Sequence, residues 1–244
     1  ISPEAPIPIV KLSERQLIPG GAANVAMNLA TLEAKVCILG IYGDDEAGKA
    51  LRGALENAGV SCHLHFYSGP TITKTRIVSQ KQHICRLDNE ELLEVPSHFI
   101  DECRKLIGEV DLVILSDYAK GTLLNSVDII NICREKECPV LVDPKSDNFE
   151  KYNGATLIKP NLREFRQAAN YNGDQDQIKD AIIKFYDDIN VHYLLVTMGS
   201  AGMYCYDGQS VAYFDASKND VFDVTGAGDT VLAVLGAMWA TNVS

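Results

Sequence analysis

Short apolar segments alternate with amphipathic segments along most of the chain. The apolar segments predict strands at 35–41, 110–116, 139–143, 155–159 and 193–197. Helix-period segments predict helices at about 22–32, 46–58, 97–108, 124–136, 161–169 and 175–189. Because strands that alternate with helices form βαβ units, this pattern predicts an α/β fold with a mainly parallel sheet, covered by helices on both faces.

One region breaks this alternation. Residues 71–88 contain two strand patterns and a tight turn near Lys81, with no helix between them, and residues 6–12 also have an extended pattern. We expect these segments to form a small β lid on the α/β core. The expected division assigns 1–18 and 61–88 to the lid, and 19–60 and 89–244 to the core.

Polar or glycine-rich loops follow the predicted core strands. They comprise residues 43–48, 117–121, 144–145, 160–164 and 198–202. Ligands of open parallel sheets bind at the carboxyl ends of the strands. Five such loops at one sheet edge therefore predict a site for a large, charged, polar ligand.

Composition narrows the class of protein. The chain has 244 residues, 46% of them hydrophobic, which suffices for one sizeable core. Its 22 basic and 33 acidic residues give a net charge of −11, which argues against a nucleic-acid partner. No apolar run approaches the length of a membrane span, so no membrane partner is expected. Seven cysteines without a CxxC pair indicate reduced thiols in a cytoplasmic protein.

His63 and His65 alternate along a predicted strand and could share a metal ion. No third ligand lies near them in the sequence. A plain strand surface is therefore the favoured interpretation of this pair.

The segment 225-TGAGD-229 precedes a long apolar run. Backbone N–H groups at a helix N-terminus attract anions, and glycines allow an anion to approach them closely. Asp229 could accept a proton from an attacking hydroxyl group. Taken alone, however, the segment is better explained as an ordinary helix start with Thr225 as its N-cap.

Residues 223-DVTGAGDT-230 resemble the second signature of the ribokinase-like (PfkB-type) carbohydrate kinases. Residues 20–48 resemble the first signature, 161-NLRE-164 matches the N-x-x-E motif, and 197–202 matches the nucleotide-side glycine loop. The resemblance spans essentially the whole chain. It implies a ribokinase-like three-layer α/β/α core with a small β-sheet lid, and a phosphotransferase that uses ATP and Mg²⁺.

Four segments, 20–30, 73–88, 115–123 and 142–161, resemble the heptose-7-phosphate kinase branch of that family. This implies phosphorylation of the anomeric 1-hydroxyl of D-glycero-β-D-manno-heptose 7-phosphate to the 1,7-bisphosphate, in ADP-heptose and lipopolysaccharide core synthesis. Another sugar or sugar-phosphate kinase of the same family is one alternative. A non-catalytic ligand-binding remnant is another, although the intact Asp229 and N-x-x-E motif argue against it.

The resemblance also assigns roles to individual residues. Asp229 is the expected general base, and Gly226, Ala227 and Gly228 form the expected anion hole. The expected substrate-binding residues are Gly20, Gly21, Asn24, Asp44, Lys74, Arg76, Arg86, Asp117 and Lys120. The expected ATP-side residues are Lys145, Asn161, Glu164, Thr197, Gly199 and Gly202. Glu164 is expected to hold Mg²⁺ through water, and Asp223 corresponds to an optional potassium site.

Several of these residues also have ordinary structural explanations. Lys74 and Arg76 lie on one face of a strand, roughly 7 Å apart, which suits a substrate phosphate. A solvated strand face is the alternative, above all for Arg86. Asn161 and Glu164 have the spacing of a capping box. Asp117 could simply pair with Lys120. Gly199 and Gly202 could form a hairpin turn, and these alternatives stay open.

The chain departs from the family pattern at both ends. The family opens with a strand that ends in a sugar-binding Asp, and it continues beyond the helix after Asp229. We therefore expect this chain to be trimmed at both ends, without the adenylyltransferase domain to which heptose kinases of this branch are fused. The resemblance also implies a homodimer formed through the lid.

Overall fold

A six-stranded sheet forms the centre of the fold in the computed structural model, which describes residues 10–79, 82–145, 148–174, 177–216 and 226–241. Its strand order is β10-β9-β8-β7-β6-β5. The strands are β5 (Val113–Ser116), β6 (Val140–Asp143), β7 (Leu157–Ile158), β8 (Tyr193–Thr197), β9 (Met203–Tyr206) and β10 (Val211–Phe214). Neighbours from β5 to β8 are parallel, and β8, β9 and β10 are antiparallel.

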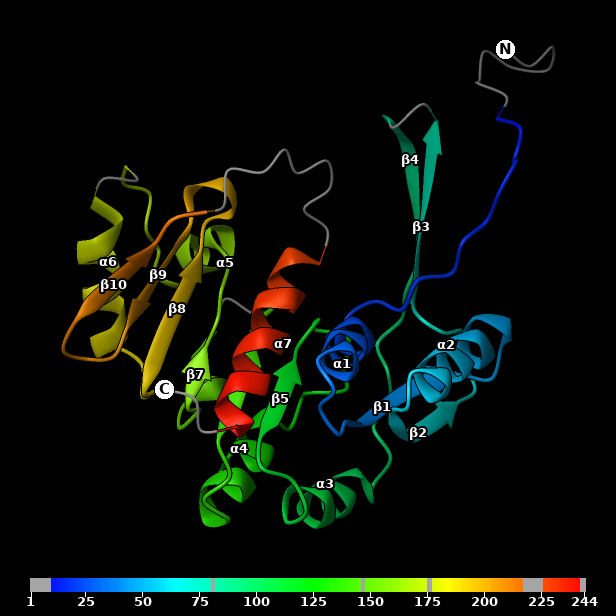
Figure 1. The fold of residues 1–244 in the computed structure, drawn as a ribbon, viewed down its shortest axis with the longest axis horizontal. Helices are drawn as coiled ribbons and strands as arrows, with labels where there is room; N and C mark the ends of the chain where they lie inside the picture. The colour runs from blue at the N-terminus through cyan, green and yellow to red at the C-terminus, as the bar shows by residue number, and fades with distance from the viewer. Residues whose placement is uncertain (1–9, 80–81, 146–147, 175–176, 217–225, 242–244) are drawn as a thin grey trace.

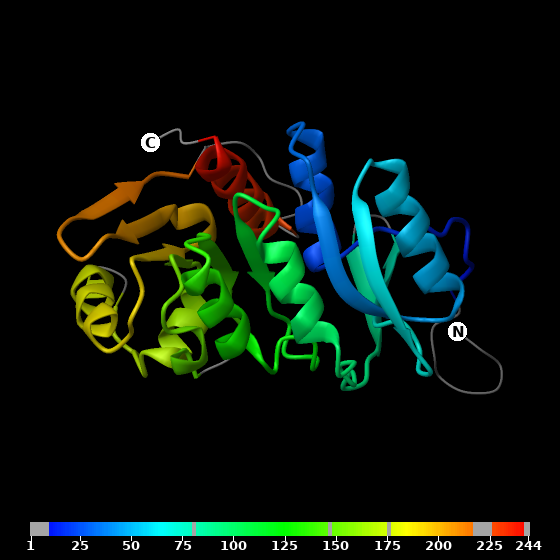
Figure 2. The same ribbon diagram turned by 90° about the horizontal axis from the view of Figure 1, so that it is seen from below.

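Helices cover both faces of this sheet, which confirms the expected three-layer α/β/α core. One face carries α3 (Phe99–Ile107), α4 (Ser126–Glu135), α5 (Leu162–Ala168) and α6 (Ile178–Asp187), and the other carries α1 (Ala22–Thr31) and α7 (Ala227–Ala240). Figure 2 shows the two sets of helices on opposite sides of the strands. Single-turn 3-10 helices lie at Glu150–Tyr152 and Gly199–Ala201.

Alternating side chains of the strands fill two separate cores. Val140 and Val142 of β6 pack with the α3–α6 layer, whereas Leu141 between them packs with α1 and α7. β8 repeats this division, with Leu194 and Val196 on the first side. Because both faces of a strand are buried, its sequence is continuously apolar, and this is the pattern that predicted the sheet.

A second, two-stranded sheet lies beside α1. It consists of β1 (Cys37–Gly43) and β2 (Ser61–Tyr67), which are parallel and joined by α2 (Glu46–Asn57). Ala23, Ala26, Leu55 and Val60 form its small core against α1. Residues 61–67, grouped with the lid in the sequence, thus pair with a strand outside the hairpin.

An antiparallel hairpin projects from the body of the molecule. It consists of β3 (Thr73–Ser79) and β4 (Gln82–Asn89), which confirms the two strands predicted between 71 and 88. Figure 1 shows the hairpin standing away from the α/β layers, with the described part of the N-terminal segment near its base. Residues 10–19 form neither helix nor strand.

All seven cysteines lie in the described ranges and are free thiols, as the sequence predicts. Cys103 and Cys133 are buried, and burial raises the pKa of the Cys103 thiol to about 11. Within the described ranges, none of the helices combines the length and apolarity that crossing a bilayer requires.

Asp45 anchors the chain that leads into the hairpin. Its carboxylate accepts hydrogen bonds from the Gly48 N–H at 2.8 Å, as the N-cap of α2, and from the Thr71 N–H at 2.9 Å and hydroxyl at 2.6 Å. Burial alone would raise the pKa of Asp45, but these hydrogen bonds outweigh it and lower the pKa below its ordinary value of 3.8. The Thr71 hydroxyl also accepts from the buried Gly43 N–H at 3.0 Å.

Thr71→Val should therefore weaken the attachment of the hairpin. The substitution keeps the volume of the side chain but leaves the buried Gly43 N–H without its acceptor, which typically costs about 1–3 kcal/mol. Urea denaturation should show a loss of unfolding free energy in that range. Thr75→Val, at an exposed position of β3, is the matched control and should change it by less than about 0.5 kcal/mol. Equal stability of the two variants would contradict the anchoring role.

Candidate active site

The N-terminus of α7 carries the predicted general base. Gly226 is the N-cap, one residue later than the expected Thr225, which lies outside the described residues. Its φ of 81° is left-handed backbone that favours glycine, and a Cβ there would lie 2.8 Å from the Asn24 Nδ2. Asp229 follows in the first turn, and only 8% of it is exposed. Ala227 and Gly228 lie between these two residues, so the glycine segment and the carboxylate share one helix end.

Asn24 and Asp229 meet although 205 positions separate them. The Asn24 Nδ2 donates to the Asp229 Oδ2 at 2.6 Å. The Tyr118 hydroxyl lies 3.5 Å from the other carboxylate oxygen, Oδ1. The expected sugar-binding residue and the expected base are therefore in direct contact.

Gly21, at the start of α1, allows close packing against the loop after β5. Gly21 is the N-cap of α1 with a φ of 57°, and a Cβ there would lie 3.2 Å from the Tyr118 ring. Burial of Tyr118 and the negative charge of Asp229 raise the pKa of its hydroxyl, so it stays protonated and can donate. Gly21 thus packs against Tyr118, whose hydroxyl lies 3.5 Å from the Asp229 Oδ1, whereas a Cβ at Gly20 would meet no atom within 4 Å.

A buried lysine that the sequence analysis did not select lies beside the glycine segment. Lys159 at the end of β7 is only 2% exposed, and its Nζ donates to the Asp143 Oδ1 at 2.9 Å. The same Nζ lies 3.2 Å from the position that a Cβ of Gly228 would occupy. A lysine at the ligand-side end of a buried strand is the signal that could have identified it. Burial raises the pKa of Asp143, and the Lys159 charge offsets part of that rise.

Asp117 is a second buried carboxylate in this region, with 5% exposed. Its Oδ2 accepts from the Lys151 Nζ at 2.7 Å and from the Tyr152 hydroxyl at 2.6 Å. Lys120 instead pairs with Glu90 at 2.7 Å. The pairing of Asp117 with Lys120 that the sequence analysis considered is therefore not formed, because each residue has another partner.

The predicted cations of the hairpin lie together and are partly balanced by acids. Arg76 and Arg86 are opposite each other in the β3–β4 register. Arg86 binds Asp88 at 2.8 Å, and Lys74 binds Glu90 at 2.9 Å and Asp88 at 3.3 Å. Glu90 thus contacts both Lys74 and Lys120, and it connects the base of the hairpin to the loop that contains Tyr118.

The expected ATP-side residues gather at the ends of β6, β7 and β8. Asn161 and Glu164 form the predicted capping box, with reciprocal hydrogen bonds of 3.0 Å. The other Glu164 oxygen pairs with the Lys145 Nζ at 2.8 Å. Asn161 and Thr197 form an isolated parallel bridge. These contacts bring the three strand ends to one place.

Gly199 and Gly202 lie in the connection between β8 and β9, which confirms the hairpin turn considered for them. Both have positive φ, and the Met198 N–H donates to the Gly202 carbonyl at 2.8 Å.

Asp44 is exposed beside α2 and pairs with Lys49 at 3.3 Å. Asp223 lies outside the described residues.

Charged neighbours at this sheet edge act on the Asp143 carboxylate. The charges of Glu164 and Asp229 both contribute to the raised pKa of Asp143, while Lys159 opposes them. Carboxylate oxygens are the ligands that Mg²⁺ prefers, and an ammonium group beside helix N–H donors suits a phosphoryl group. The arrangement can therefore hold a metal-bound polyphosphate next to a proton acceptor.

Comparisons with known proteins point to one family. The sequence profile described as pfkB family carbohydrate kinase matches residues 3–244. The bifunctional protein HldE of Hahella chejuensis is 42% identical over 248 residues, covering 99% of this chain and 52% of that protein. The chain thus spans about half the length of the curated relatives it matches.

Solved structures share the fold at low sequence identity. The tetrameric inhibited form of phosphofructokinase-2 from Escherichia coli has a TM-score of 0.78 at 16% identity, with 92% of this chain and 77% of that chain covered. The same enzyme in complex with potassium has a TM-score of 0.77 at 17% identity, with 92% and 75% covered. These likenesses concern the fold alone.

Lys159→Met should destabilise the protein strongly at neutral pH. The substitution leaves the Asp143 carboxylate unpaired, and breaking a buried ion pair costs about 3–5 kcal/mol. The folded-state pKa of Asp143 is raised, so its ionised form is disfavoured by folding. The loss of unfolding free energy should therefore be largest near pH 7–8 and should shrink as the pH falls through that raised pKa.

Denaturation curves of Lys159→Met at several pH values test this expectation. Lys145→Met is the matched control, because Lys145 is half exposed and its pair with Glu164 should contribute only about 0–1 kcal/mol. A pH-independent deficit would contradict the assigned pairing of Lys159 with Asp143.

Proposed function

This chain belongs to the pfkB family of carbohydrate kinases, and we propose that it transfers the γ-phosphoryl group of ATP to the anomeric 1-hydroxyl of D-glycero-β-D-manno-heptose 7-phosphate. One observation carries the proposal: Asn24 holds the carboxylate of Asp229 at the N-terminus of α7, across 205 residues of sequence. The 42% identity to HldE of Hahella chejuensis supports a heptose phosphate as the acceptor.

Asp229 acts as the general base in this proposal. The 1-hydroxyl oxygen of the sugar attacks the γ-phosphorus, the bond to the bridging oxygen of ADP breaks, and the hydroxyl proton passes to Asp229. Asn24 and Tyr118 orient the carboxylate through its two oxygens. The N–H groups at the start of α7 and the Lys159 ammonium group, which lies beside Gly228, stabilise negative charge on the phosphoryl oxygens.

The carboxylates of this edge suit Mg²⁺. Glu164, together with Asp143, would hold the ion on the phosphate side, with water completing its shell. The ion, when bound, neutralises charge on the phosphates. Lys145 pairs with Glu164 and keeps that carboxylate oriented.

The hairpin supplies the contacts to the 7-phosphate of the sugar. Arg76 and Arg86 face each other across the strands, and guanidinium groups bind phosphate through two parallel hydrogen bonds. Lys74 and Lys120 add charge at the base of the hairpin through their shared contact with Glu90. This basic group stands out in a chain with a net charge of −11.

Further properties follow from the family and from the relatives. A phosphofructokinase-2 structure contains potassium, which supports an optional monovalent-cation site at Asp223. The exposed side chains of Val78, Ile84 and Leu87 on the hairpin support a homodimer formed through it. Fusion to an adenylyltransferase domain is proposed, since HldE is bifunctional and about twice as long. A cytoplasmic setting agrees with the free thiols.

Asp229→Asn should abolish phosphoryl transfer while sugar binding is kept. The amide occupies the same volume but cannot accept the proton, and loss of a general base lowers kcat by about 10²- to 10⁴-fold. A coupled ADP-release assay with a panel of sugars and sugar phosphates measures the rate, and calorimetry measures sugar binding. Asp128→Asn, on the exposed surface of α4, should leave both unchanged. Turnover of Asp229→Asn near that of the wild type would sink the assignment.

Arg76→Ala should raise KM for the phosphorylated sugar about tenfold or more and leave KM for ATP nearly unchanged. The reason is that a lost charged hydrogen bond to phosphate weakens binding by about 1.5–3 kcal/mol. Arg104→Ala is the matched control, because it removes a surface arginine of α3 that pairs with Glu135 of α4, outside the hairpin. Equal increases in both KM values would count against a phosphate contact by the hairpin.

A further inference from the structure

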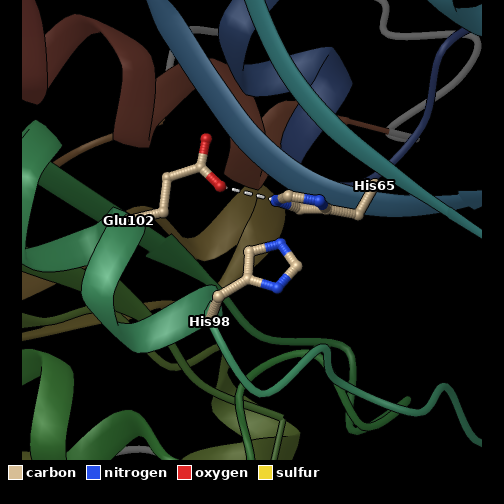
Figure 3. A group of neighbouring side chains, drawn as sticks. All are labelled: His65, His98 and Glu102. Atoms are coloured by element: carbon tan, nitrogen blue, oxygen red, sulfur yellow. Dashed lines mark hydrogen bonds and ion pairs between the residues drawn. The ribbon is translucent and has the colours of Figure 1, made fainter.

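A cluster of histidines and one carboxylate lies outside the candidate active site, between β2 and α3. The Glu102 carboxylate forms hydrogen bonds with two imidazole rings. Its Oε1 lies 3.1 Å from the His63 Nδ1, and its Oε2 lies 2.7 Å from the His65 Nε2. His98 immediately precedes α3, and its ring centroid is 4.9 Å from that of His65. Figure 3 shows the side chains of His65, His98 and Glu102 converging from the two elements.

We propose that His65, His98 and Glu102 bind a divalent transition-metal ion, for which zinc is the best match. One ligand atom of each of the three lies within 4.8 Å of the other two. Imidazole nitrogen and carboxylate oxygen are the ligands that zinc takes besides thiolate, and three protein ligands with one open position are a common zinc arrangement. Aqueous Mg²⁺ prefers oxygen ligands, so this site is chemically distinct from the one proposed at the phosphates.

The cluster needs only a small adjustment to enclose the ion. Bonds of about 2.0–2.1 Å in tetrahedral geometry place ligand atoms about 3.4 Å apart. The separations, all within 4.8 Å, must therefore shrink by at most roughly 1.4 Å, while the 2.7 Å between the His65 Nε2 and the Glu102 Oε2 must lengthen. His98 is exposed, and within the described parts of the chain neither of its ring nitrogens has a hydrogen-bond partner. Its ring can therefore turn towards Glu102 without breaking a hydrogen bond, although its edge contact with the His65 ring would shift.

Glu102 and His63 are arranged as a ligand and its support. Glu102 is three-quarters buried, with 24% of its side chain exposed, and each of its two oxygens lies within hydrogen-bonding distance of an imidazole nitrogen. A carboxylate only accepts, so the Nε2 of His65 carries a proton in the metal-free protein. The ion replaces that proton, while His63 continues to orient the carboxylate through Oε1.

The surroundings leave room for an ion to enter. An open depression of about 350 Å³ is lined by His63, His98, Asp101, Glu102, Lys105 and Leu106. The acid Asp101 adds negative charge at its rim. The depression therefore opens two of the proposed ligands, His98 and Glu102, to solvent from the α3 side.

The position of the cluster suggests what a bound ion does. His65 lies near the end of β2, and His98 lies directly before α3. The hairpin of β3 and β4 lies between them in the sequence, so an ion bound by these ligands would join the two ends of that segment. His65 also packs against Phe99, which belongs to the main core, at a centroid distance of 6.2 Å. A metal ion here would fasten the β1–β2 sheet and the hairpin stem to α3, and because only the folded chain brings the ligands together, its binding would stabilise the folded state.

Zinc binding to the full-length protein, after chelator treatment, tests the proposal. Competition with a zinc indicator should show one tight site, and zinc at 100-fold over its Kd should raise Tm by roughly 5–10 °C. His98→Ala and Glu102→Gln should each weaken zinc binding by on the order of 100-fold or more, and His63→Ala by about 10- to 100-fold. His83→Ala, a histidine on β4 outside the cluster, is the matched control and should bind like the wild type.

Cobalt substitution identifies the ligands. Co²⁺ in this site should give the visible absorption bands of a four-coordinate ion without a thiolate charge-transfer band, and His98→Ala should lose those bands. His98 is exposed, so this variant should fold, which circular dichroism verifies. Equal zinc affinity in the wild type and in His98→Ala, or a thiolate band, would overturn the proposal and leave a hydrogen-bonded His–Glu cluster. Neither readout depends on phosphoryl transfer.

Discussion

The hydrogen bond between Asn24 and Asp229 is the contact on which the candidate site depends. It joins the first described helix to the last one, and both helices cover the same face of the sheet. Their packing on Leu141, Leu157 and Leu195 sets where the two helix starts meet. The apolar core of this face therefore positions a polar pair that neither helix could orient alone. A carboxylate that is 8% exposed needs such a partner, because burial without hydrogen bonds would be costly.

The same edge of the sheet collects the other charged groups because parallel strands all end there. Lys159 and Asp143 lie at the ends of the neighbouring strands β7 and β6, and each charge pairs with the other in a place where either alone would be unstable. Asp117 is satisfied by Lys151 and Tyr152 from the segment after β6. The site is thus a set of mutually compensated charges, and a phosphate ligand would enter a field that is already organised.

The sequence predicted the features that depend on local pattern. Continuous apolar runs identified β5, β6, β7 and β8, since strands buried on both faces have no polar alternation. The spacing of Asn161 and Glu164 identified a capping box that the structure confirms. β2, in contrast, was grouped with the lid, because 61-SCHLHFY-67 mixes polar and apolar residues. The partners of Lys159, Asp117 and Glu102 were not predicted from the sequence. Those pairings join elements that are distant in sequence, and only the tertiary arrangement brings them together.

The hairpin has a consequence for how this enzyme family can change over time. All residues of β4 are exposed, and none of the described hairpin residues belongs to a hydrophobic core cluster. Substitutions on its faces therefore carry little cost to folding, whereas its attachment at Asp45 and Thr71 is constrained by hydrogen bonds. The phosphate contacts proposed for this hairpin could therefore change without any change in the helix starts that hold Asn24 and Asp229. Selection can thus act on substrate choice and on stability almost independently.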